Sequence, residues 1–256
     1  MSLKLNTPLI SVDWLLSNLE NEQLIILDAT IPKVTSKTNK ILEETHQIKN
    51  ARFFDIQSVF SDVHAPYPNT VLSPEEFEVK AQKLGINNTS CIVVYDDLGI
   101  YSSPRKEYPT EQPNFHQPKK GNFKANYQPQ KVKFTSDVLS AIENNKMLIA
   151  DARSKGRFYA TEPEPRKGLK GGHIPNSISF PISDIIVDGK LKSAEELKEI
   201  FKEKNPTNKE FIFTCGSGIT ATVLALGAEM AGFKNHAVYD GSWTEWASTE
   251  NLPIEK

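Results

Sequence analysis

Cys215 starts a loop that is suited to hold an ionised thiol. Residues 215–220 read Cys-Gly-Ser-Gly-Ile-Thr; they follow the apolar residues 211–213 and precede a helical pattern. Backbone N–H groups at a helix N-terminus and the positive end of the helix dipole stabilise an anion. These groups favour the thiolate form of the side chain, which makes Cys215 a candidate nucleophile. The pattern indicates sulfur chemistry.

The second cysteine, Cys91, lies in the strand-like sequence Cys-Ile-Val-Val-Tyr at residues 91–95. Burial among apolar side chains raises the pKa of a thiol and makes it unreactive. We therefore interpret Cys91 as a core residue and Cys215 as the reactive thiol. A chain with only two cysteines has no disulfide framework, which favours a reducing, cytoplasmic compartment.

The composition argues against several classes of partner. Across 256 residues the formal net charge is -2 and like charges form no block, so neither nucleic acid nor a membrane surface is an expected partner. No apolar run reaches the ~20 residues that a membrane span needs, and the N-terminal residues lack the apolar core of a signal peptide. The length suits one large domain or two ordinary domains.

The chain contains an imperfect internal repeat. When residues 16–29 are placed on residues 139–152, both copies read as a short helix followed by a strand that ends in Asp-Ala. Further on, Ser73 and Ser193 each precede a glutamate by three residues, which predicts a capped helix start in each copy. Strands that alternate with helices predict an α/β fold with parallel sheets flanked by helices.

Only the second copy has a nucleophile. Residues 92–95 align with residues 211–214, so Asp96 occupies the place of Cys215 and the first copy is catalytically silent. The first copy also lacks the helix and the strand that follow Cys215, and it continues into a segment rich in Pro, Lys, Asn and Gln. We therefore expect an incomplete N-terminal sheet. The predicted organisation is a non-catalytic domain at 1–105, a linker at 106–131 and a catalytic domain at 132–256.

Five motifs, in order, carry a resemblance to a known family. They are Asp-Ala-Arg with Gly-Arg-Phe at 151–158, Glu-Pro-Glu-Pro-Arg at 162–166, Gly-His-Ile-Pro at 172–175, the Cys215 loop, and Asp-Gly-Ser-Trp-Thr-Glu-Trp at 240–246. On these motifs the chain resembles the two-domain rhodanese superfamily, and within it the 3-mercaptopyruvate sulfurtransferases. The resemblance implies tandem rhodanese-like domains. It also implies transfer of sulfane sulfur from 3-mercaptopyruvate, less well from thiosulfate, to a thiol or cyanide through a cysteine persulfide.

The resemblance further implies the residues of the site. Cys215 would be the nucleophile, and Arg157 and Arg166 would bind the carboxylate and the neighbouring carbonyl of the donor through their planar guanidinium groups. The loop would contact the substrate through Gly216, Ser217, Gly218, Ile219 and Thr220. Thiosulfate sulfurtransferases carry cations just after the cysteine, whereas residues 216–218 are uncharged here, which favours mercaptopyruvate.

No metal or organic cofactor is implied. The expected partners are the small-molecule sulfur donor and a thiol acceptor such as thioredoxin or glutathione. The family also places a histidine in a His-Ile-Pro-like segment of its first domain, with a proton-relay role toward the loop serine. The residue at that place is Gln47, next to His46, so we assign no such relay.

Two other functions stay open. The first alternative is a cysteine phosphatase, which uses a similar loop. It is disfavoured because a phosphatase needs an arginine six places after its cysteine, and that place is Ala221 here. Because the first copy is incomplete, a catalytically impaired sulfur-binding or redox-sensing module is the second alternative. Among the remaining motif residues, we interpret Asp151 as a binder of backbone amides, His173 as structural, and Trp243 and Trp246 as core.

Overall fold

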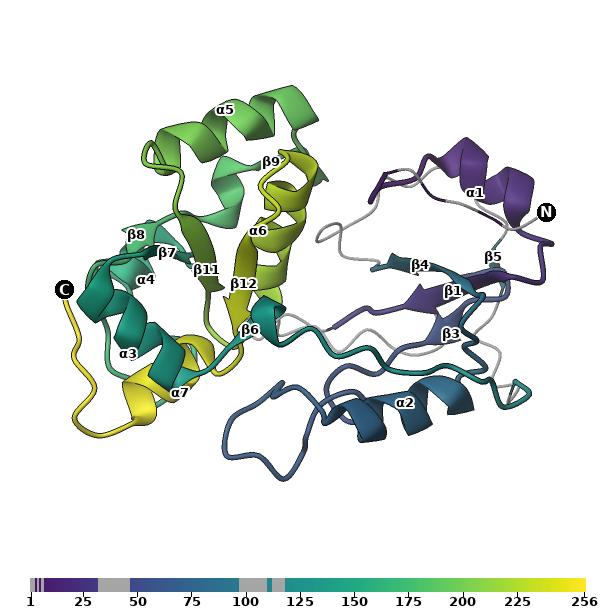
Figure 1. Ribbon diagram of the computed structural model, residues 1–256, viewed down its shortest axis with the longest axis horizontal. Coiled ribbons are helices and arrows are strands. Elements are labelled where there is room, and N and C mark those ends of the chain that lie inside the picture. The colour runs from purple at the N-terminus through teal and green to yellow at the C-terminus, as the bar shows by residue number, and fades with distance from the viewer. Residues whose placement is uncertain (1–2, 4, 6, 32–46, 97–109, 112–117) are drawn as a thin grey trace. The chain divides into compact units, whose positions relative to one another are not determined.

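The computed structural model describes residues 3, 5, 7–31, 47–96, 110–111 and 118–256 of the chain. The chain divides into two compact units (Figure 1). The first unit contains residues 1–61 and 72–127, and the second contains residues 62–71 and 128–256. None of the helices within the described ranges is long and apolar enough to cross a lipid bilayer.

A five-stranded parallel sheet forms the centre of the second unit. Its strands run in the order β6 (Val132–Lys133), β12 (His236–Tyr239), β11 (Glu210–Thr214), β7 (Met147–Asp151) and β8 (Ile178–Ser179). Consecutive residues in the last part of both β7 and β11 are buried, as expected for a parallel sheet that is covered on two faces. Because β7 and β11 are parallel, the loops that follow them leave the sheet at the same end, the carboxyl end of the strands. Ligands bind at this end in sheets of this kind.

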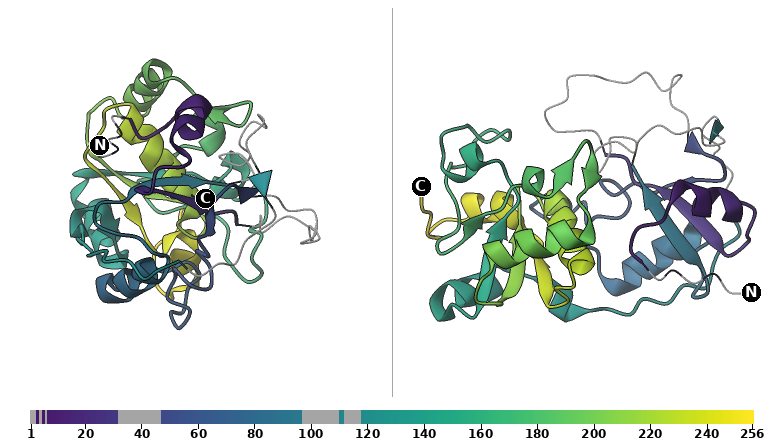
Figure 2. Two further views of the ribbon diagram at one scale, coloured as in Figure 1. Left: turned by 90° about the vertical axis from the view of Figure 1, so that its right-hand side faces the viewer. Right: turned by 90° about the horizontal axis from the view of Figure 1, so that it is seen from above.

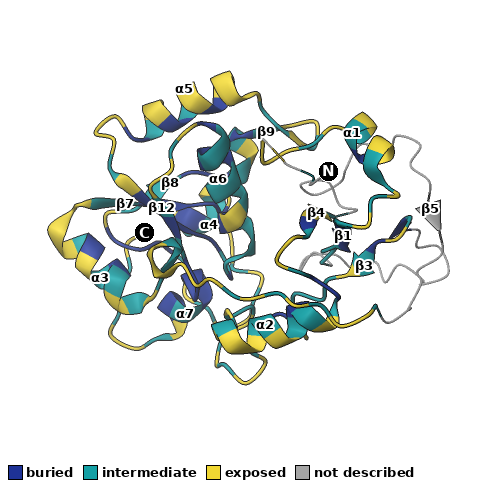
Figure 3. Cartoon of the chain, turned by 45° about the vertical axis from the view of Figure 1, so that its right-hand side comes forward, coloured by how far each residue is buried: buried dark blue, intermediate teal, exposed yellow. Residues whose placement is uncertain are grey.

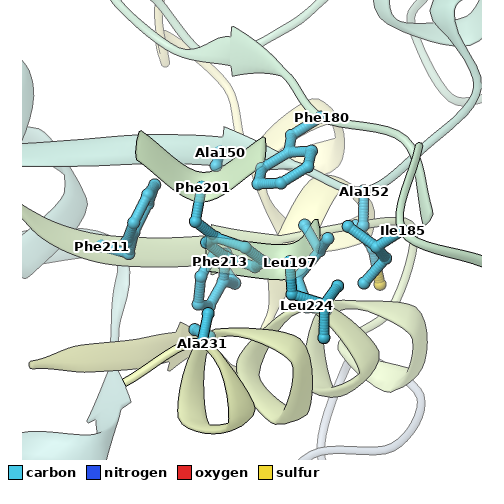
Figure 4. Packing of buried hydrophobic residues seen from close by; sticks show 13 residues of the cluster. Ala150, Ala152, Phe180, Ile185, Leu197, Phe201, Phe211, Phe213, Leu224 and Ala231 are labelled. Carbon is cyan, nitrogen blue, oxygen red and sulfur yellow. The ribbon is translucent and has the colours of Figure 1, made fainter. Parts of the chain in front are cut away.

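Helices cover both faces of this sheet (Figure 1, Figure 2). α5 (Ala194–Lys204) and α6 (Ile219–Met230) pack on one face, and α3 (Thr135–Asn144) and α7 (Ser242–Ser248) pack on the other. Below α5, the ring of Phe201 contacts the rings of Phe211 and Phe213 from β11 (Figure 4). The side of α5 that faces away from this core is exposed (Figure 3).

Several short elements complete the second unit. They are η2 (Pro129–Lys131), α4 (Lys155–Phe158), η3 (Ile182–Asp184), and the antiparallel pair β9 (Ile186–Val187) and β10 (Lys190–Leu191). α4 is functionally relevant because it carries Arg157 and ends in the buried Phe158. The segment 62–71 also belongs to this unit, although it comes from the first half of the sequence.

The first unit has a smaller sheet. In the described part of the chain, its parallel strands run in the order β3 (Arg52–Phe53), β1 (Leu24–Asp28) and β4 (Cys91–Tyr95). α1 (Val12–Asn18) packs on one face and α2 (Pro74–Lys83) packs on the other. A separate antiparallel pair joins β2 (Gln47–Ile48) to β5 (Thr110–Glu111). The predicted α/β class with parallel sheets flanked by helices is confirmed.

Local sequence determines where the helices begin. Ser73 and Ser193 each accept a hydrogen bond from the N–H three residues later, and the glutamate there accepts one from the serine N–H, so both predicted capping boxes are confirmed. Gly218 is the N-cap residue of α6, and its φ of 87° lies in the left-handed region that side chains rarely adopt. The Cys215 loop thus enters its helix through a glycine.

The two sheets share the register of their central strands. β1 pairs with β4, and β7 pairs with β11, over five residues each and with the first residue opposite the first. Ile92 of β4 therefore takes the place that Phe211 has in β11. β12 lies on the far side of β11, whereas no strand of the described residues lies beside β4. As far as the described residues extend, the N-terminal sheet is incomplete, as predicted.

One face of β4 is partly exposed, because no helix of the described residues covers it. Ile92 and Val94 are 37% and 58% exposed, whereas the corresponding Phe211 and Phe213 are fully buried beneath α5 and α6. Each strand pairs in the same register with the corresponding neighbour, β1 or β7, but the two strands bury different amounts of apolar surface. Hydrophobic stabilisation is roughly proportional to buried apolar area, so β4 is held less firmly than β11.

Part of the predicted linker, residues 106–131, lies outside the described residues. Residues 118–127 belong to the first unit, where the Phe123 N–H donates to the Ile86 carbonyl (3.1 Å) and the Phe123 ring contacts Phe77 of α2. This stretch therefore has fixed partners in the first unit. The predicted domain limits at 105 and 131 stay a prediction.

The difference between β4 and β11 has a measurable consequence. We expect the amides of residues 92–96 to exchange with deuterium faster than those of residues 211–214, because partial opening of the first unit exposes less apolar surface. Phe213→Ala should lower the free energy of unfolding of the second unit by about 3–5 kcal/mol. Val94→Ala should change the stability of the first unit by about 0.5 kcal/mol or less, since its side chain is mostly exposed. Equal amide protection in the two strands would contradict this interpretation.

Candidate active site

Cys215 lies directly after β11, at the carboxyl end of the sheet. The residue is buried, and its N–H donates to the Ser242 hydroxyl (3.2 Å) at the start of α7. The Ser242 hydroxyl donates in turn to the Tyr239 carbonyl (2.9 Å) at the end of β12. The backbone of the predicted nucleophile is therefore fixed by β11, β12 and α7 together.

The loop after Cys215 turns its carbonyl groups outward. The carbonyls of residues 215–217 accept hydrogen bonds from, in this order, the Trp243 N–H (2.9 Å), the Thr244 N–H (2.9 Å) and the Asn69 side-chain amide (3.2 Å). In a trans peptide the next N–H points away from the carbonyl, so the N–H groups of residues 216–218 face the opposite side of the loop. Within the described ranges these three N–H groups have no protein acceptor. They form a ready binding place for an anion.

Arg157 and Arg166 lie beside Gly216. A Cβ atom placed on Gly216 would lie 3.1 Å from Nη2 of Arg157 and 3.7 Å from Nη1 of Arg166. The structure thus brings together the two arginines and the cysteine loop that the sequence predicted. It also gives a physical reason for glycine at position 216, because a side chain there would displace the guanidinium group of Arg157.

A buried chain of alternating charges holds Arg157 in place. The Arg153 guanidinium, which has no solvent exposure, contacts Asp151 through Nη2 (2.6 Å) and Glu164 through Nη1 (2.6 Å). Glu164, whose side chain is 2% exposed, accepts a further bond from Nη2 of Arg157 (2.6 Å). Desolvation opposes the charge of Arg153, but the two carboxylates outweigh it and raise its pKa. The four charges of this network cancel.

Arg166 supplies the unbalanced positive charge of the site. Its Nη2 donates to the Ser217 hydroxyl (3.2 Å), and no carboxylate in the described part of the chain lies within 4.0 Å of its guanidinium nitrogens. An anionic ligand would therefore meet one cation whose charge is not neutralised by a neighbour. A carboxylate suits this arrangement, because arginine can bind it with two parallel hydrogen bonds.

Most neighbouring motif residues are structural. Asp151 accepts from the Arg153 N–H (2.9 Å) as well as from its guanidinium, as expected of a binder of backbone amides. Trp243 and Trp246 are fully buried in the core, as expected. His173 donates from Nδ1 to the carbonyl of Phe158 (3.0 Å), and its ring stacks on the Phe158 ring. These residues shape the surroundings of Cys215.

Asn69 is a site residue that the sequence did not reveal. Its side-chain Nδ2 donates to the Ser217 hydroxyl (3.0 Å) and to the Ser217 carbonyl (3.2 Å). The sequence around it, Pro-Tyr-Pro-Asn at 66–69, indicates only a turn. The distance of 148 positions between Asn69 and Ser217 is the reason, because no local pattern can predict such a contact.

The structure places the remaining residues that the sequence singled out as follows. Cys91 is buried in β4, and desolvation raises the pKa of its thiol, which agrees with an inert core residue. Gln47 is buried in the first unit and donates to the Ala51 carbonyl (3.1 Å). His46 lies outside the described residues. Ile219 and Thr220 form the first turn of α6, directly behind the glycine turn.

Comparison with known proteins assigns the family. The model of the rhodanese-like domain matches residues 135–249. The 3-mercaptopyruvate sulfurtransferase of Escherichia coli (strain K12) is 31% identical over 279 residues, which cover 96% of this chain and 97% of the relative. The human 3-mercaptopyruvate sulfurtransferase is 34% identical over 272 residues, which cover 93% of this chain and 91% of the relative. Both alignments are longer than the 256 residues of this chain, so each relative has residues without a counterpart here.

Solved structures agree with these matches. The Tum1 protein from Saccharomyces cerevisiae has a TM-score of 0.84 at 25% identity, with 97% of this chain and 98% of the other covered. SseA from Escherichia coli, a 3-mercaptopyruvate sulfotransferase by its description, has a TM-score of 0.79 at 28% identity. The match covers 93% of this chain and 99% of SseA. The fold is that of a rhodanese. The chain belongs to the two-domain rhodanese superfamily with the 3-mercaptopyruvate sulfurtransferases, and it is a sulfurtransferase.

The charge network makes Glu164 a sensitive position. Glu164→Gln keeps the shape of the side chain but removes a carboxylate. Arg153 would keep its contact with Asp151, whereas Arg157 would lose the one carboxylate that it contacts in the described part of the chain. We expect a loss of about 3 kcal/mol in the free energy of unfolding, because removing one partner leaves buried charge uncompensated. The KM for an anionic sulfur donor should also rise, since Arg157 is no longer held beside Gly216. Chemical denaturation and steady-state kinetics measure the two effects.

Glu162→Gln is the matched control for this substitution. Glu162 lies two residues away in the same segment and is exposed, so its loss of charge should change stability by about 0.5 kcal/mol or less. If both variants lost the same stability, the ion network would not be what holds this segment.

The carboxyl group of Asp240 provides a test by pH. Burial raises its pKa from 3.8 to about 6, although the Val71 N–H, 3.2 Å from Oδ1, favours the charged form. Glu245 also raises this pKa through charge repulsion. Between pH 4 and 6 the folded state then binds more protons than the unfolded state. The contribution of Asp240 to stability is therefore complete below pH ~4 and is lost as the pH rises through about 6.

Asp240→Asn should remove this dependence while keeping an oxygen that accepts from Val71. We expect the variant to gain stability relative to the wild type as the pH rises from 4 to 7, by on the order of 1–2 kcal/mol after allowance for solvent screening. Urea unfolding of both proteins at a series of pH values measures the difference. A difference that stays constant with pH would rule out a raised pKa at Asp240.

Proposed function

We propose that this sulfurtransferase takes sulfane sulfur from 3-mercaptopyruvate and holds it as a persulfide on Cys215. The observation that carries the proposal is the position of Arg157 and Arg166 beside Gly216, one residue after the predicted nucleophile. A 2-oxo acid with a thiol on its third carbon has a carboxylate for the arginines and a sulfur for the cysteine. The relatives described above carry the name of this donor, which supports the same choice here.

The first half-reaction needs one nucleophile and one anion site. The Cys215 thiolate attacks the sulfur of the donor, an S–S bond forms, and the C–S bond breaks with its electron pair moving to the methylene carbon. The resulting enolate takes up the proton that the donor thiol carried, and pyruvate leaves. Cys215 is left as the persulfide anion. No electron or atom has to come from another reagent.

The loop amides suit both forms of the cysteine. Residues 216–218 direct their N–H groups to the side opposite the outward carbonyls, and an anion on either sulfur would be stabilised there. The second half-reaction is attack by an acceptor thiol on the outer sulfur, which restores the Cys215 thiolate. Thioredoxin and glutathione are acceptors of the right chemistry, and cyanide is a third. A reducing, cytoplasmic compartment would supply the thiols.

The absence of charge at residues 216–218 favours 3-mercaptopyruvate over thiosulfate as the donor. Thiosulfate is a dianion without a carboxylate or a ketone, and residues 216–218 offer it no additional cation. We therefore propose that thiosulfate is used less well than 3-mercaptopyruvate. The first copy, with Asp96 in place of the cysteine, does not take part in the covalent step.

A thiocyanate assay with cyanide as the acceptor tests the proposal. Wild-type protein should turn over 3-mercaptopyruvate, and Cys215→Ser should reduce the rate to background, because a serine hydroxyl is not ionised at neutral pH and cannot hold a persulfide. Cys91→Ser is the matched control and should keep the wild-type kcat. Mass spectrometry of wild-type protein treated with the donor alone should find one additional sulfur on the peptide that contains Cys215.

The same assay compares the donors. The wild-type kcat/KM should be higher for 3-mercaptopyruvate than for thiosulfate, and Arg166→Ala should mainly raise the KM for 3-mercaptopyruvate, because carboxylate binding is shared by the ground state and the transition state. Activity that survives in Cys215→Ser but not in Cys91→Ser would reverse the assignment of the two thiols. A higher kcat/KM for thiosulfate would refute the proposed donor.

A further inference from the structure

The side-chain amide of Asn69 has one defined orientation. Its Nδ2 lies 3.2 Å from the Ser217 carbonyl, and a carbonyl oxygen only accepts hydrogen bonds. The nitrogen end of the amide must therefore face Ser217. The same nitrogen has a second hydrogen, and the Ser217 hydroxyl oxygen lies 3.0 Å away to accept it.

The hydroxyl of Ser217 has a second donor in Arg166. Nη2 of Arg166 lies 3.2 Å from the same oxygen, and a guanidinium group only donates. A hydroxyl oxygen has two lone pairs, and both are then used as acceptors for Asn69 and Arg166. The O–H bond of Ser217 must point away from both nitrogens, so the hydroxyl is left as a donor to a ligand.

The segment that carries Asn69 is anchored on both sides of it. The Tyr67 hydroxyl lies 3.3 Å from the Thr249 hydroxyl, and the Val71 N–H donates to the Asp240 carboxylate (3.2 Å). Thr70 closes the turn through its hydroxyl, which donates to the Tyr67 carbonyl (2.9 Å). Asn69 itself has a φ of 63°, a left-handed conformation in which asparagine is favoured over most residues. Asn69 is thus held in place rather than free to swing.

We propose that Asn69 is a positioning residue that fixes the Ser217 hydroxyl as a hydrogen-bond donor to the ketone oxygen of the sulfur donor. The proposal rests on the proposed function above. When the C–S bond of 3-mercaptopyruvate breaks, the electron pair is delocalised onto this oxygen as an enolate. A donor that is already oriented stabilises that charge at no cost of reorganisation in the transition state.

The choice of an amide has a consequence for proton transfer. An asparagine side chain neither gives up nor takes a proton in the reaction, so it cannot draw the proton from Ser217. The resemblance to the family implied a histidine relay toward the loop serine, whereas the contact observed at Ser217 is an amide. Ser217 therefore acts as a neutral donor, and the proton that completes pyruvate is the one from the thiol of the substrate.

Two variants of Asn69 separate its amide from its backbone. Asn69→Gly removes the side chain but keeps the left-handed conformation without strain. Asn69→Asp keeps the shape but replaces the donating nitrogen by an oxygen, which would accept from Ser217 and turn its hydroxyl away. Asn208→Gly is the matched control, because Asn208 is exposed, has a φ of 50° and precedes β11 at the end of the strand opposite Cys215.

The expected result is a loss in kcat. With 3-mercaptopyruvate, Asn69→Gly and Asn69→Asp should each lower kcat roughly tenfold, and Asn69→Gly should change KM less than about threefold, because the lost interaction is made in the transition state. Asn69→Asp should also raise KM, since it places a negative charge near the donor. Asn208→Gly should stay within about twofold of the wild type. Thermal unfolding of Asn69→Gly and Asn208→Gly checks that both fold.

A double-mutant cycle with Ser217→Ala decides whether Asn69 acts through the hydroxyl. In the Ser217→Ala background the effect of Asn69→Gly on kcat should disappear. An equal loss in both backgrounds, or a kcat of Asn69→Gly within twofold of the wild type, would overturn the proposal while leaving the proposed function intact. A wild-type protein that releases no pyruvate from 3-mercaptopyruvate would overturn both.

Discussion

The buried guanidinium group of Arg153 is the interaction on which the rest of the site depends. It contacts Asp151 at the end of β7, Glu164 in the following segment and the Gly172 carbonyl, and its carbon lies 4.2 Å from the ring centre of Trp243 in α7. One planar group with five donors thus joins four segments of the second unit. A lysine could not replace it, because a single ammonium group cannot reach these partners in fixed directions.

This network also explains how a site can hold several cations beside a buried cysteine. Glu164 neutralises Arg157 and orients it toward Gly216, while Arg166 keeps its charge available. The charges of the network cancel within a low-dielectric interior, where an unpaired charge would be costly. Only the charge that an anionic substrate would neutralise is left over. The charge of Arg166 is therefore the one that binding of an anionic substrate would neutralise.

The two copies of the fold show what a covering helix contributes. β4 and β11 pair in the same register with the corresponding strands β1 and β7, yet the positions that are fully buried in β11 are partly exposed in β4. Hydrogen bonding and the buried side chains of Cys91 and Val93 therefore maintain β4, whereas burial of the other face of such a strand requires a helix packed above it. In the second unit α5 and α6 supply this burial, and the Cys215 loop lies at the start of α6. Stability and chemistry are linked there through one element.

The sequence by itself determined the features that depend on neighbouring residues. The alternation of strands and helices, the capping boxes at Ser73 and Ser193, the duplication, and the glycine-rich loop after Cys215 all follow from short-range patterns. Only the tertiary structure decided that Glu164 joins two arginines and that the amide of Asn69 meets Ser217. Contacts of this kind are made between segments that the fold brings together, so their geometry is set by packing of the whole unit and leaves no local pattern to read.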